Sequence, residues 1–401
     1  MQTYSYTASD SLGKVLHGVI PAENDLDLAN KVSGLGHYLI RAKVVANPVK
    51  VNYRLRRLKP RDVLTFTIHL YALLDSGAHL SSALGDLARD AAVDDVRKLI
   101  EDIRLRVEGG MSLRESLSYH PKSFPKIYTA VVGAGESTGK LLSALKDLIG
   151  LLEWQLELRS KMTEAMVYPL TLICAMMGVV ILLVVKVIPI FEPLFAQGGI
   201  SLPLPTRIVL GVSSFVRSFW YLCLATPVLL VVGYKFYYST PGGRYVIDNF
   251  KLKLPVFGEL LRKVALSRFC RTFAISLKSG VTVLSSLDIA SEVVGNIRLE
   301  RSVAKARDSV NVGEKISTSL QATGDFPPLV VRMIGVGEQS GSLPEALDKV
   351  NLFYDREVPA TIKMMFTFFE PAMIVVIGVV VGGIAISVLL PMFQLAQVIG
   401  D

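Results

Sequence analysis

Residues 135–141 read Gly-Glu-Ser-Thr-Gly-Lys-Leu, and residues 337–343 read Gly-Glu-Gln-Ser-Gly-Ser-Leu. The two stretches lie 202 residues apart in a chain of 401 residues and share the pattern Gly-Glu-x-x-Gly-x-Leu. The segments around these stretches, about 61–197 and 264–397, also align with each other at nearly the same offset. An alignment of this length does not arise by chance, so the chain contains an internal duplication. Further pairs at this offset, or at 203, are Ser76-Gly77 with Ser279-Gly280, Phe124-Pro125 with Phe326-Pro327, and Pro169 with Pro371.

Three segments are almost purely apolar: residues 167–190, 219–238 and 369–393. Each is long enough to cross a bilayer as a helix, which takes about 20 residues. The whole chain is 51% hydrophobic and 19% charged, with a mean hydropathy of +0.45. An ordinary soluble domain is about 25% charged. The composition therefore predicts a membrane protein, with most of its mass outside the bilayer.

The duplication predicts the topology. Each copy consists of a polar helical domain, 61–166 or 264–366, followed by one apolar span. If the copies fold alike, both domains lie on one side of the membrane and both spans run the same way. The segment 219–238 has no counterpart in the repeat and supplies the return crossing, after a periplasmic loop and interfacial segment at 191–218. Basic residues near the domain ends of the spans place both domains in the cytoplasm of an inner membrane and the C-terminus in the periplasm.

We predict that residues 1–50 form a small N-terminal α+β module. Short stretches with alternating apolar and polar residues flank a turn at Ser11-Leu12-Gly13, and a helical stretch and another apolar run follow, in the order ββαβ. The predicted fold is therefore mainly α. It is a polytopic membrane protein with two homologous cytoplasmic helical-bundle domains, three transmembrane helices and this module.

The motif at 135–141 resembles a phosphate-binding loop only superficially. Such a loop needs a glycine five residues before Gly-Lys and a Ser or Thr after the lysine, but Ala134 and Leu141 stand there. We interpret both copies as tight turns between helices, in which glycines permit positive φ and a glutamate satisfies backbone donors. These interaction or structural candidates are Gly135, Glu136 and Gly139 in the first copy and Gly337, Glu338 and Gly341 in the second.

No motif for catalysis, a cofactor or a metal stands out in the sequence. The histidines form no ligand pattern, and neither Gly-x-Ser-x-Gly nor His-Glu-x-x-His occurs. The carboxylates of Asp94-Asp95 and Glu101-Asp102 indicate a solvated helix face, with adventitious calcium binding as the alternative. The net charge of +8 fits domains held on the cytoplasmic side and predicts no nucleic-acid partner. We predict no enzyme activity and no cofactor.

Further candidates lie at the spans. Pro169 and Pro371 occupy equivalent positions at the two span entries, and we expect Glu370 to lie at a helix start, where a carboxylate is favoured. Gly378 and Gly382 form a Gly-x-x-x-Gly face that allows two helices to approach closely, which makes oligomerisation a hypothesis.

Together, these features resemble the general secretion F and type IV pilus platform family. The residues that carry the resemblance are the duplicated Gly-Glu-x-x-Gly-x-Leu domain, Tyr168-Pro169 with Pro189, Glu370-Pro371 with the closing Leu389-Leu390-Pro391-Met392-Phe393, and the opening Tyr4-Ser5-Tyr6-Thr7-Ala8. The resemblance covers essentially the whole chain. It does not distinguish a secretion system from a pilus.

The resemblance implies a non-enzymatic inner-membrane platform. Its implied partners are a hexameric cytoplasmic assembly ATPase, pilin or pseudopilin subunits that enter a filament, other inner-membrane assembly proteins, membrane lipids and further copies of the chain. The alternative is a small transporter or permease built on a parallel repeat. The few polar residues in the spans count against it. A membrane-bound enzyme would need a catalytic cluster that the sequence does not show.

Overall fold

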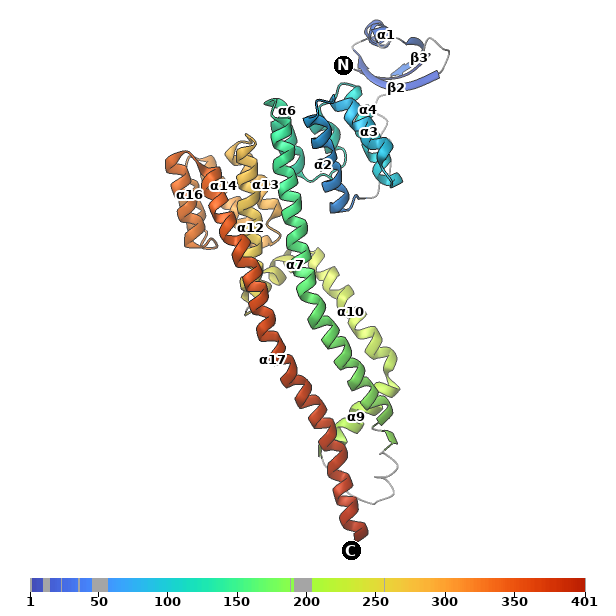
Figure 1. Ribbon diagram of the computed structural model, residues 1–401, viewed down its shortest axis with the longest axis vertical. Helices are drawn as coiled ribbons and strands as arrows, with labels where there is room; N and C mark the ends of the chain where they lie inside the picture. Colours follow the sequence, from blue (N-terminus) through green and yellow to red (C-terminus); the bar gives the residue numbers. More distant parts are fainter. Residues whose placement is uncertain are drawn as a thin grey trace. The chain divides into compact units, whose positions relative to one another are not determined.

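The computed structural model describes residues 2–9, 15–22, 24–34, 37–44, 57–187, 189–190, 204–255 and 257–400 (Figure 1). Three parts of the predictions lie outside the described residues: the turn at Ser11-Leu12-Gly13, the end of the N-terminal module at 45–50, and residues 191–203 of the loop and interfacial segment. The chain divides into two compact units, Met1–Glu153 with Ser279–Val281, and Trp154–Lys278 with Thr282–Asp401. Helices dominate both units.

The N-terminal elements form an antiparallel sheet covered by a helix. Strand β1 (Gln2–Ser9) pairs with β2 (Val15–Ala22) and β3 (Tyr38–Val44), in the order β2-β1-β3, and α1 (Asp25–Gly34) precedes β3. Side chains of a strand alternate between its two faces, so Tyr4 and Ala8 lie on one face of β1. They are buried in one core with Leu28 and Val32 of α1.

The first repeat is a helical bundle whose core contains a chain of three aromatic rings. The ring centroids of Phe66 and Phe124 are 5.7 Å apart, and those of Phe124 and Tyr128 are 4.9 Å apart. All three side chains are buried. The helices are α2 (Pro60–Asp75), α3 (Leu80–Asp90), α4 (Asp94–Glu108), α5 (Leu113–Ser118), α6 (Lys126–Ser137) and α7 (Leu141–Leu182).

The second repeat has the same order of helices and the same aromatic contact. Phe269 and Phe326, at the positions of Phe66 and Phe124, have ring centroids 5.3 Å apart. The internal duplication read from the sequence is therefore also present in the packing. The helices are α12 (Phe257–Lys278), α13 (Val283–Val293), α14 (Ile297–Asn311), α15 (Ile316–Ala322), α16 (Pro328–Ser340) and α17 (Leu343–Gly400).

The last helix of each repeat continues into the apolar segment without a break. Pro169 lies inside α7 and Pro371 inside α17. The expectation that Glu370 lies at a helix start is therefore wrong, because α17 begins at Leu343. A proline removes one backbone donor, but neighbouring groups in a membrane helix compensate for that loss, so the helix can continue through it. By length and composition, α7 and the part Leu343–Ser387 of α17 are apolar enough to cross a membrane.

Within the second unit, α7 and α17 run in the same direction. Trp154 Nε1 donates to Asp355 Oδ1 at 3.0 Å, and Tyr168 Oη donates to Glu370 Oε1 at 3.3 Å. The second contact lies further along both helices than the first, so the helices are parallel, as the duplication predicts.

Helix α10 (Trp220–Ser239) runs back in the opposite direction. It follows α9 (Leu204–Ser218), where Thr206 Oγ1 donates to the carbonyl of Ser387 in the later part of α17, at 2.8 Å. Its other end leads into α11 (Pro241–Lys253), which bonds to the second repeat through Asp248 and Ile297. Figure 1 shows this return path in yellow-green.

The first repeat contains a buried polar pair that the second repeat lacks. In the first repeat, Thr67 Oγ1 and Tyr128 Oη lie 2.9 Å apart, and Thr67 Oγ1 also donates to the carbonyl of Val63. The Thr67 hydroxyl has one proton, so Tyr128 is the donor in the pair. Burial raises the pKa of Tyr128, which therefore stays neutral. The equivalent positions in the second repeat hold Cys270 and Val330, two residues that need no such bond.

We predict that Thr67→Val lowers the free energy of unfolding of the first repeat by about 1–3 kcal/mol, because it leaves the buried Tyr128 hydroxyl without a partner. Adding Tyr128→Phe should restore part of the loss, since removal of both partners is nearly neutral. Pulse proteolysis of the detergent-solubilised chain in urea measures both effects. A double variant as unstable as Thr67→Val alone would contradict this account.

Candidate functional site

The shared motif places a glutamate at the same position in both repeats, where it binds the start of a short helix. Glu136 of α6 accepts hydrogen bonds from the backbone N–H groups of Leu113 at 2.8 Å and Arg114 at 3.1 Å. Glu338 of α16 accepts from Ile316 at 2.5 Å and Ser317 at 2.9 Å. The prediction that these glutamates satisfy backbone donors is confirmed.

This contact matters because the first N–H groups of a helix have no partner inside it, and because a carboxylate is stabilised at a helix N-terminus. In α5 the next donor is also satisfied. Ser112 Oγ accepts from the backbone N–H of Glu115 at 3.1 Å, and the Glu115 carboxylate accepts from the backbone N–H of Ser112, which together form a capping box. Each glutamate therefore joins two helices of its repeat, α6 to α5 or α16 to α15.

The four glycines of the motif have two different roles. Gly139 and Gly341 adopt φ values of 69° and 70° in the turn, as predicted. The expectation of positive φ is wrong for Gly135 and Gly337, which lie inside α6 and α16. These two permit close packing of the next helix instead. A Cβ on Gly135 would lie 2.5 Å from the Cβ of Ala144, and one on Gly337 would lie 2.9 Å from the Cα of Leu343.

A solvent-open cleft lies beside each glutamate. The cleft at Glu136 has a volume of about 950 Å³ and is lined by residues that include Arg114 and Ser137. The cleft at Glu338 has a volume of about 530 Å³ and includes Ser317 and Gln339. Arg114 and Ser317 occupy equivalent positions in the two repeats, as do Ser137 and Gln339. The duplication has thus produced two similar concave surfaces with different chemistry.

The candidate residues on the apolar helices differ in their surroundings. Glu370 and the two prolines lie at a contact between α7 and α17, whereas Gly378 and Gly382 lie on an open helix face. Tyr168 and Glu370, at equivalent positions of the two copies, bond to each other, next to Pro169 and Pro371. An added Cβ at Gly378 or Gly382 would meet no atom of the described residues within 4 Å. The Gly-x-x-x-Gly face is therefore open within the described part of this chain.

Sequence reasoning missed a polar cluster that joins α7, α12 and α17. The guanidinium carbon of Arg271 lies 4.7 Å from the centroid of the Trp154 ring. Its Nη2 donates to Asp355 Oδ1 at 2.8 Å and to Oδ2 at 2.6 Å, and Trp154 Nε1 donates to the same carboxylate. The only sequence signal was that tryptophan occurs twice in the chain.

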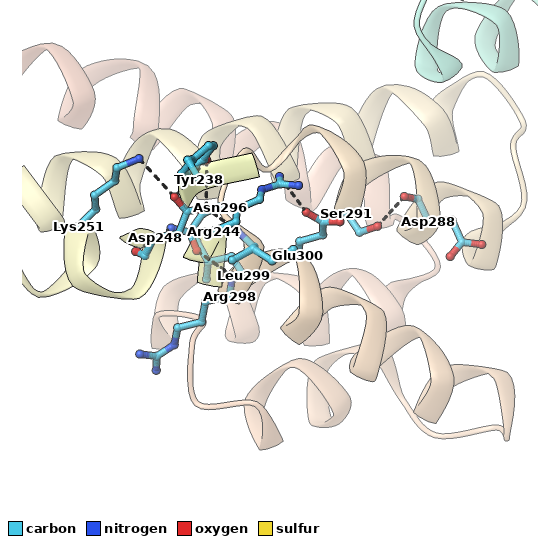
Figure 2. A network of polar contacts seen from close by, with 11 residues as sticks. Tyr238, Arg244, Asp248, Lys251, Asp288, Ser291, Asn296, Arg298, Leu299 and Glu300 are labelled. Carbon is cyan, nitrogen blue, oxygen red and sulfur yellow. Dashed lines mark hydrogen bonds and ion pairs between the residues drawn. The ribbon is translucent and has the colours of Figure 1, made fainter. Parts of the chain in front are cut away.

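A second missed cluster surrounds Asp248 of α11 (Figure 2). The side chain is only 2% exposed. It accepts hydrogen bonds from Tyr238 Oη at 3.2 Å, from Lys251 Nζ at 3.3 Å and from the backbone N–H of Ile297 at 3.2 Å. Asn296 Nδ2 donates to the Asp248 carbonyl at 3.2 Å. One buried carboxylate therefore connects the end of α10 to the start of α14.

Asp94, Glu101, Asp102 and Glu108 of α4 form ion pairs with arginines of the same helix. Asp94 pairs with Arg97 at 3.1 Å, and Asp102 pairs with Arg106 at 2.8 Å. His120 Nε2 also lies 2.8 Å from Asp102. Burial by itself would raise the pKa of Asp102, but the hydrogen bonds and charges of His120 and Arg106 together lower it. Among the described residues, no group of three or more His, Cys, Asp or Glu side chains is placed to hold a metal ion.

Comparison with known proteins agrees with this duplicated architecture. The family model for type II secretion system (T2SS) protein F matches residues 66–189 and again residues 269–391. The chain belongs to the type II secretion system protein F family. The two matched segments begin 203 and end 202 residues apart, which is the offset of the internal repeat. The family unit is therefore one helical domain together with its apolar helix.

Relatives of this family come from both kinds of machine. The chain is 36% identical over 400 residues to the type IV pilus assembly protein PilC of Thermus thermophilus, which covers 98% of each chain. It is 32% identical over 409 residues to the type II secretion system protein F of Pseudomonas aeruginosa, with all of both chains covered. It is also 36% identical over 339 residues to the PilC protein of Myxococcus xanthus, which covers 84% of this chain and 81% of the relative.

We predict that Gly135→Ala and Gly337→Ala each destabilise their repeat by about 1–3 kcal/mol, because the added Cβ overpacks the contact with the next helix. Gly150→Ala is the matched control, since a Cβ there would meet nothing within 4 Å and alanine favours a helix. Thermal unfolding of the solubilised variants measures the effect. Equal stability of Gly135→Ala and Gly150→Ala would contradict the packing role.

Proposed function

We propose that the chain is the non-enzymatic inner-membrane platform of a type IV pilus or type II secretion machine. Its partners are a hexameric cytoplasmic ATPase, pilin or pseudopilin subunits and other inner-membrane assembly proteins. Family membership supports this proposal, and so do the names of relatives that match nearly the whole chain.

In the proposed topology, α7 and α17 cross the inner membrane outward and α10 crosses it inward. Both helical domains are cytoplasmic and the C-terminus is periplasmic. The parallel course of α7 and α17 and the return course of α10 support this arrangement. The predicted 219–238 span corresponds to α10, which is 20 residues long and therefore long enough to span.

The observation that carries the proposed mechanism is the unbroken helix from each domain into its span. The core of the second domain includes Val358, Ile362 and Met365 of α17, and the same helix continues to Gly400. A helix is stiff over this length, so a displacement of the domain by a partner displaces the membrane segment as well. The platform couples ATPase movement to subunit insertion in this way.

We propose further that the paired clefts beside Glu136 and Glu338 are where cytoplasmic partners contact the domains. Their repetition and their concave shape support this role. We also propose that the open face at Gly378 and Gly382 receives a second copy of the chain, since small residues allow membrane helices to approach closely.

A flexible Gly-Ser-Gly-Ser insertion between Thr367 and Phe368 tests the coupling. This point follows the last core residues of the second domain and precedes Glu370. We expect the variant to reach the membrane in normal amount but to lose filament assembly or secretion, because the domain no longer moves its span. Filament counts or secreted protein, with immunoblots of membrane fractions, measure the outcome.

The matched control is the same insertion between Gly313 and Glu314, in an exposed turn between α14 and α15. Exposed turns tolerate insertions, so this variant should retain assembly. Normal assembly by the Thr367 insertion would contradict mechanical coupling. Solute flux through the purified, reconstituted chain without a partner would favour the transporter alternative.

Photo-crosslinking tests the partner surface. Benzoyl-phenylalanine in place of Ser137 or Gln339, both exposed at the clefts, should form adducts with the assembly ATPase in cells. The control position is Arg89, which is exposed at the end of α3 and belongs to neither cleft. ATPase adducts at Arg89 but at neither cleft position would place the contact elsewhere.

A further inference from the structure

Helix α11 is held to the rest of its unit by one face. Asp248, in the polar network of Figure 2, accepts a hydrogen bond from the backbone N–H of Ile297 at the start of α14. Asn249 Oδ1 accepts from Arg298 Nη1 at 2.9 Å. Arg244 forms an ion pair with Glu300 of α14 at 3.5 Å. These contacts fix the orientation of α11 about its own axis.

The other face of α11 is apolar and exposed. Val246 is 55% exposed and Phe250 is 62% exposed, and the two lie one helical turn apart. Lys253 is exposed on the same side of the helix, since it lies three residues beyond Phe250. Leu254 and Phe257, which follow the helix, are 37% and 41% exposed. Exposed large apolar side chains next to a lysine are typical of helices that lie in a membrane surface.

Because α11 follows directly after α10, the course of α10 determines where α11 lies relative to the membrane. Only Thr240 separates the two helices, and its Oγ1 accepts from the backbone N–H of Gly243 at 3.1 Å. The turn is tight, because a Cβ on Gly243 would lie 2.1 Å from the carbonyl oxygen of Tyr237. If α10 crosses the membrane, α11 begins where the bilayer ends.

Aromatic residues at the end of α10 agree with this depth. Tyr234, Phe236 and Tyr237 are 46%, 76% and 50% exposed. Tyrosine is enriched at the headgroup level of membranes, where its ring meets the acyl chains and its hydroxyl meets water. The end of α10 that leads into α11 therefore has the composition expected at the boundary of a membrane.

We propose that α11 is an interfacial helix that binds anionic phospholipids of the leaflet on the side of the helical domains, with Val246 and Phe250 between the acyl chains and Lys253 at the headgroups. Continuity with α10 and the positive charge of Lys253 favour lipid over a protein partner. The buried Asp248 faces the opposite way. The helix thereby holds the second helical domain at a fixed height above the membrane, through the bonds of Asp248 to α14. This inference rests on the proposed topology of α10.

The test uses the full chain in nanodiscs of phosphatidylcholine with a minor fraction of phosphatidylglycerol. Benzoyl-phenylalanine replaces Phe250 and is activated by light, and the adducts are identified by mass. Leu230, 67% exposed in the middle of α10, is the position that reports whether α10 lies in the bilayer. Val312, 79% exposed after α14, is the matched apolar position away from α11.

We expect phospholipid adducts at positions 230 and 250 and none at position 312. Adducts with phospholipid at 230 but with protein, or with nothing, at 250 overturn the inference and leave the proposed topology intact. Absence of phospholipid adducts at both 230 and 250 overturns both.

Charge reversal tests the choice of anionic lipid. Lys253→Glu should lower the yield of phosphatidylglycerol adducts at position 250 by about five-fold or more, because loss of one basic residue near an anionic surface accounts for about that factor and the new carboxylate is repelled as well. Lys305→Glu, at an exposed position of α14, should leave the yield unchanged. An equal yield with Lys253→Glu would overturn the role of the anionic headgroup.

Discussion

The arrangement of the second unit depends on the contact of Arg271 with Trp154 and Asp355. The guanidinium lies against the indole ring and bonds to both oxygens of the carboxylate, so three helices meet at one partly buried charge. A charge-assisted bond of this geometry is stronger than a neutral one, and contact with the ring adds a cation–π attraction. Because α7 and α17 are continuous helices, fixing them at this point also fixes the relative course of their apolar segments.

The duplication explains why two such helices exist. Each repeat uses a glutamate to bind the start of a short helix, a helical glycine to admit the next helix, and a second glycine to turn the chain between them. Repetition of these contacts shows that they belong to the construction of the domain. The differences between the copies are more informative about function, since the two clefts have different linings and the buried Thr67–Tyr128 pair exists only in the first repeat.

Helix α11 has no counterpart in the repeat, and it belongs to the part of the chain that returns from one copy to the next. Its buried carboxylate joins α10 to α14, and its exposed face carries Val246 and Phe250. The connection between the copies is thus more than a linker. It connects α10 to the second domain through the bonds of Asp248. It also places the exposed apolar face of α11 at the expected edge of the membrane.

Much of this architecture is visible in the sequence. The offset between copies identified the two domains, and the equivalent phenylalanines indeed contact equivalent partners in the two cores. The role of Glu136 and Glu338 followed from their place between glycines. Two expectations were wrong for the same reason. The sequence predicts a turn at Gly135 and Gly337 and a helix start at Glu370, because glycine and proline usually interrupt helices. Here a close helix contact requires the glycine, and the long helix continues through the proline.

The sequence by itself determined the duplication, the apolar segments and the turns at Gly139 and Gly341, because each of these is encoded in residues close together or at a fixed offset. Only the tertiary structure decided that Trp154 meets Asp355, that Tyr168 meets its own equivalent Glu370, and that Asp248 binds the start of α14. Such bonds form only when donor and acceptor are brought to about 3 Å. That separation depends on how whole helices pack, and no spacing along the chain records it.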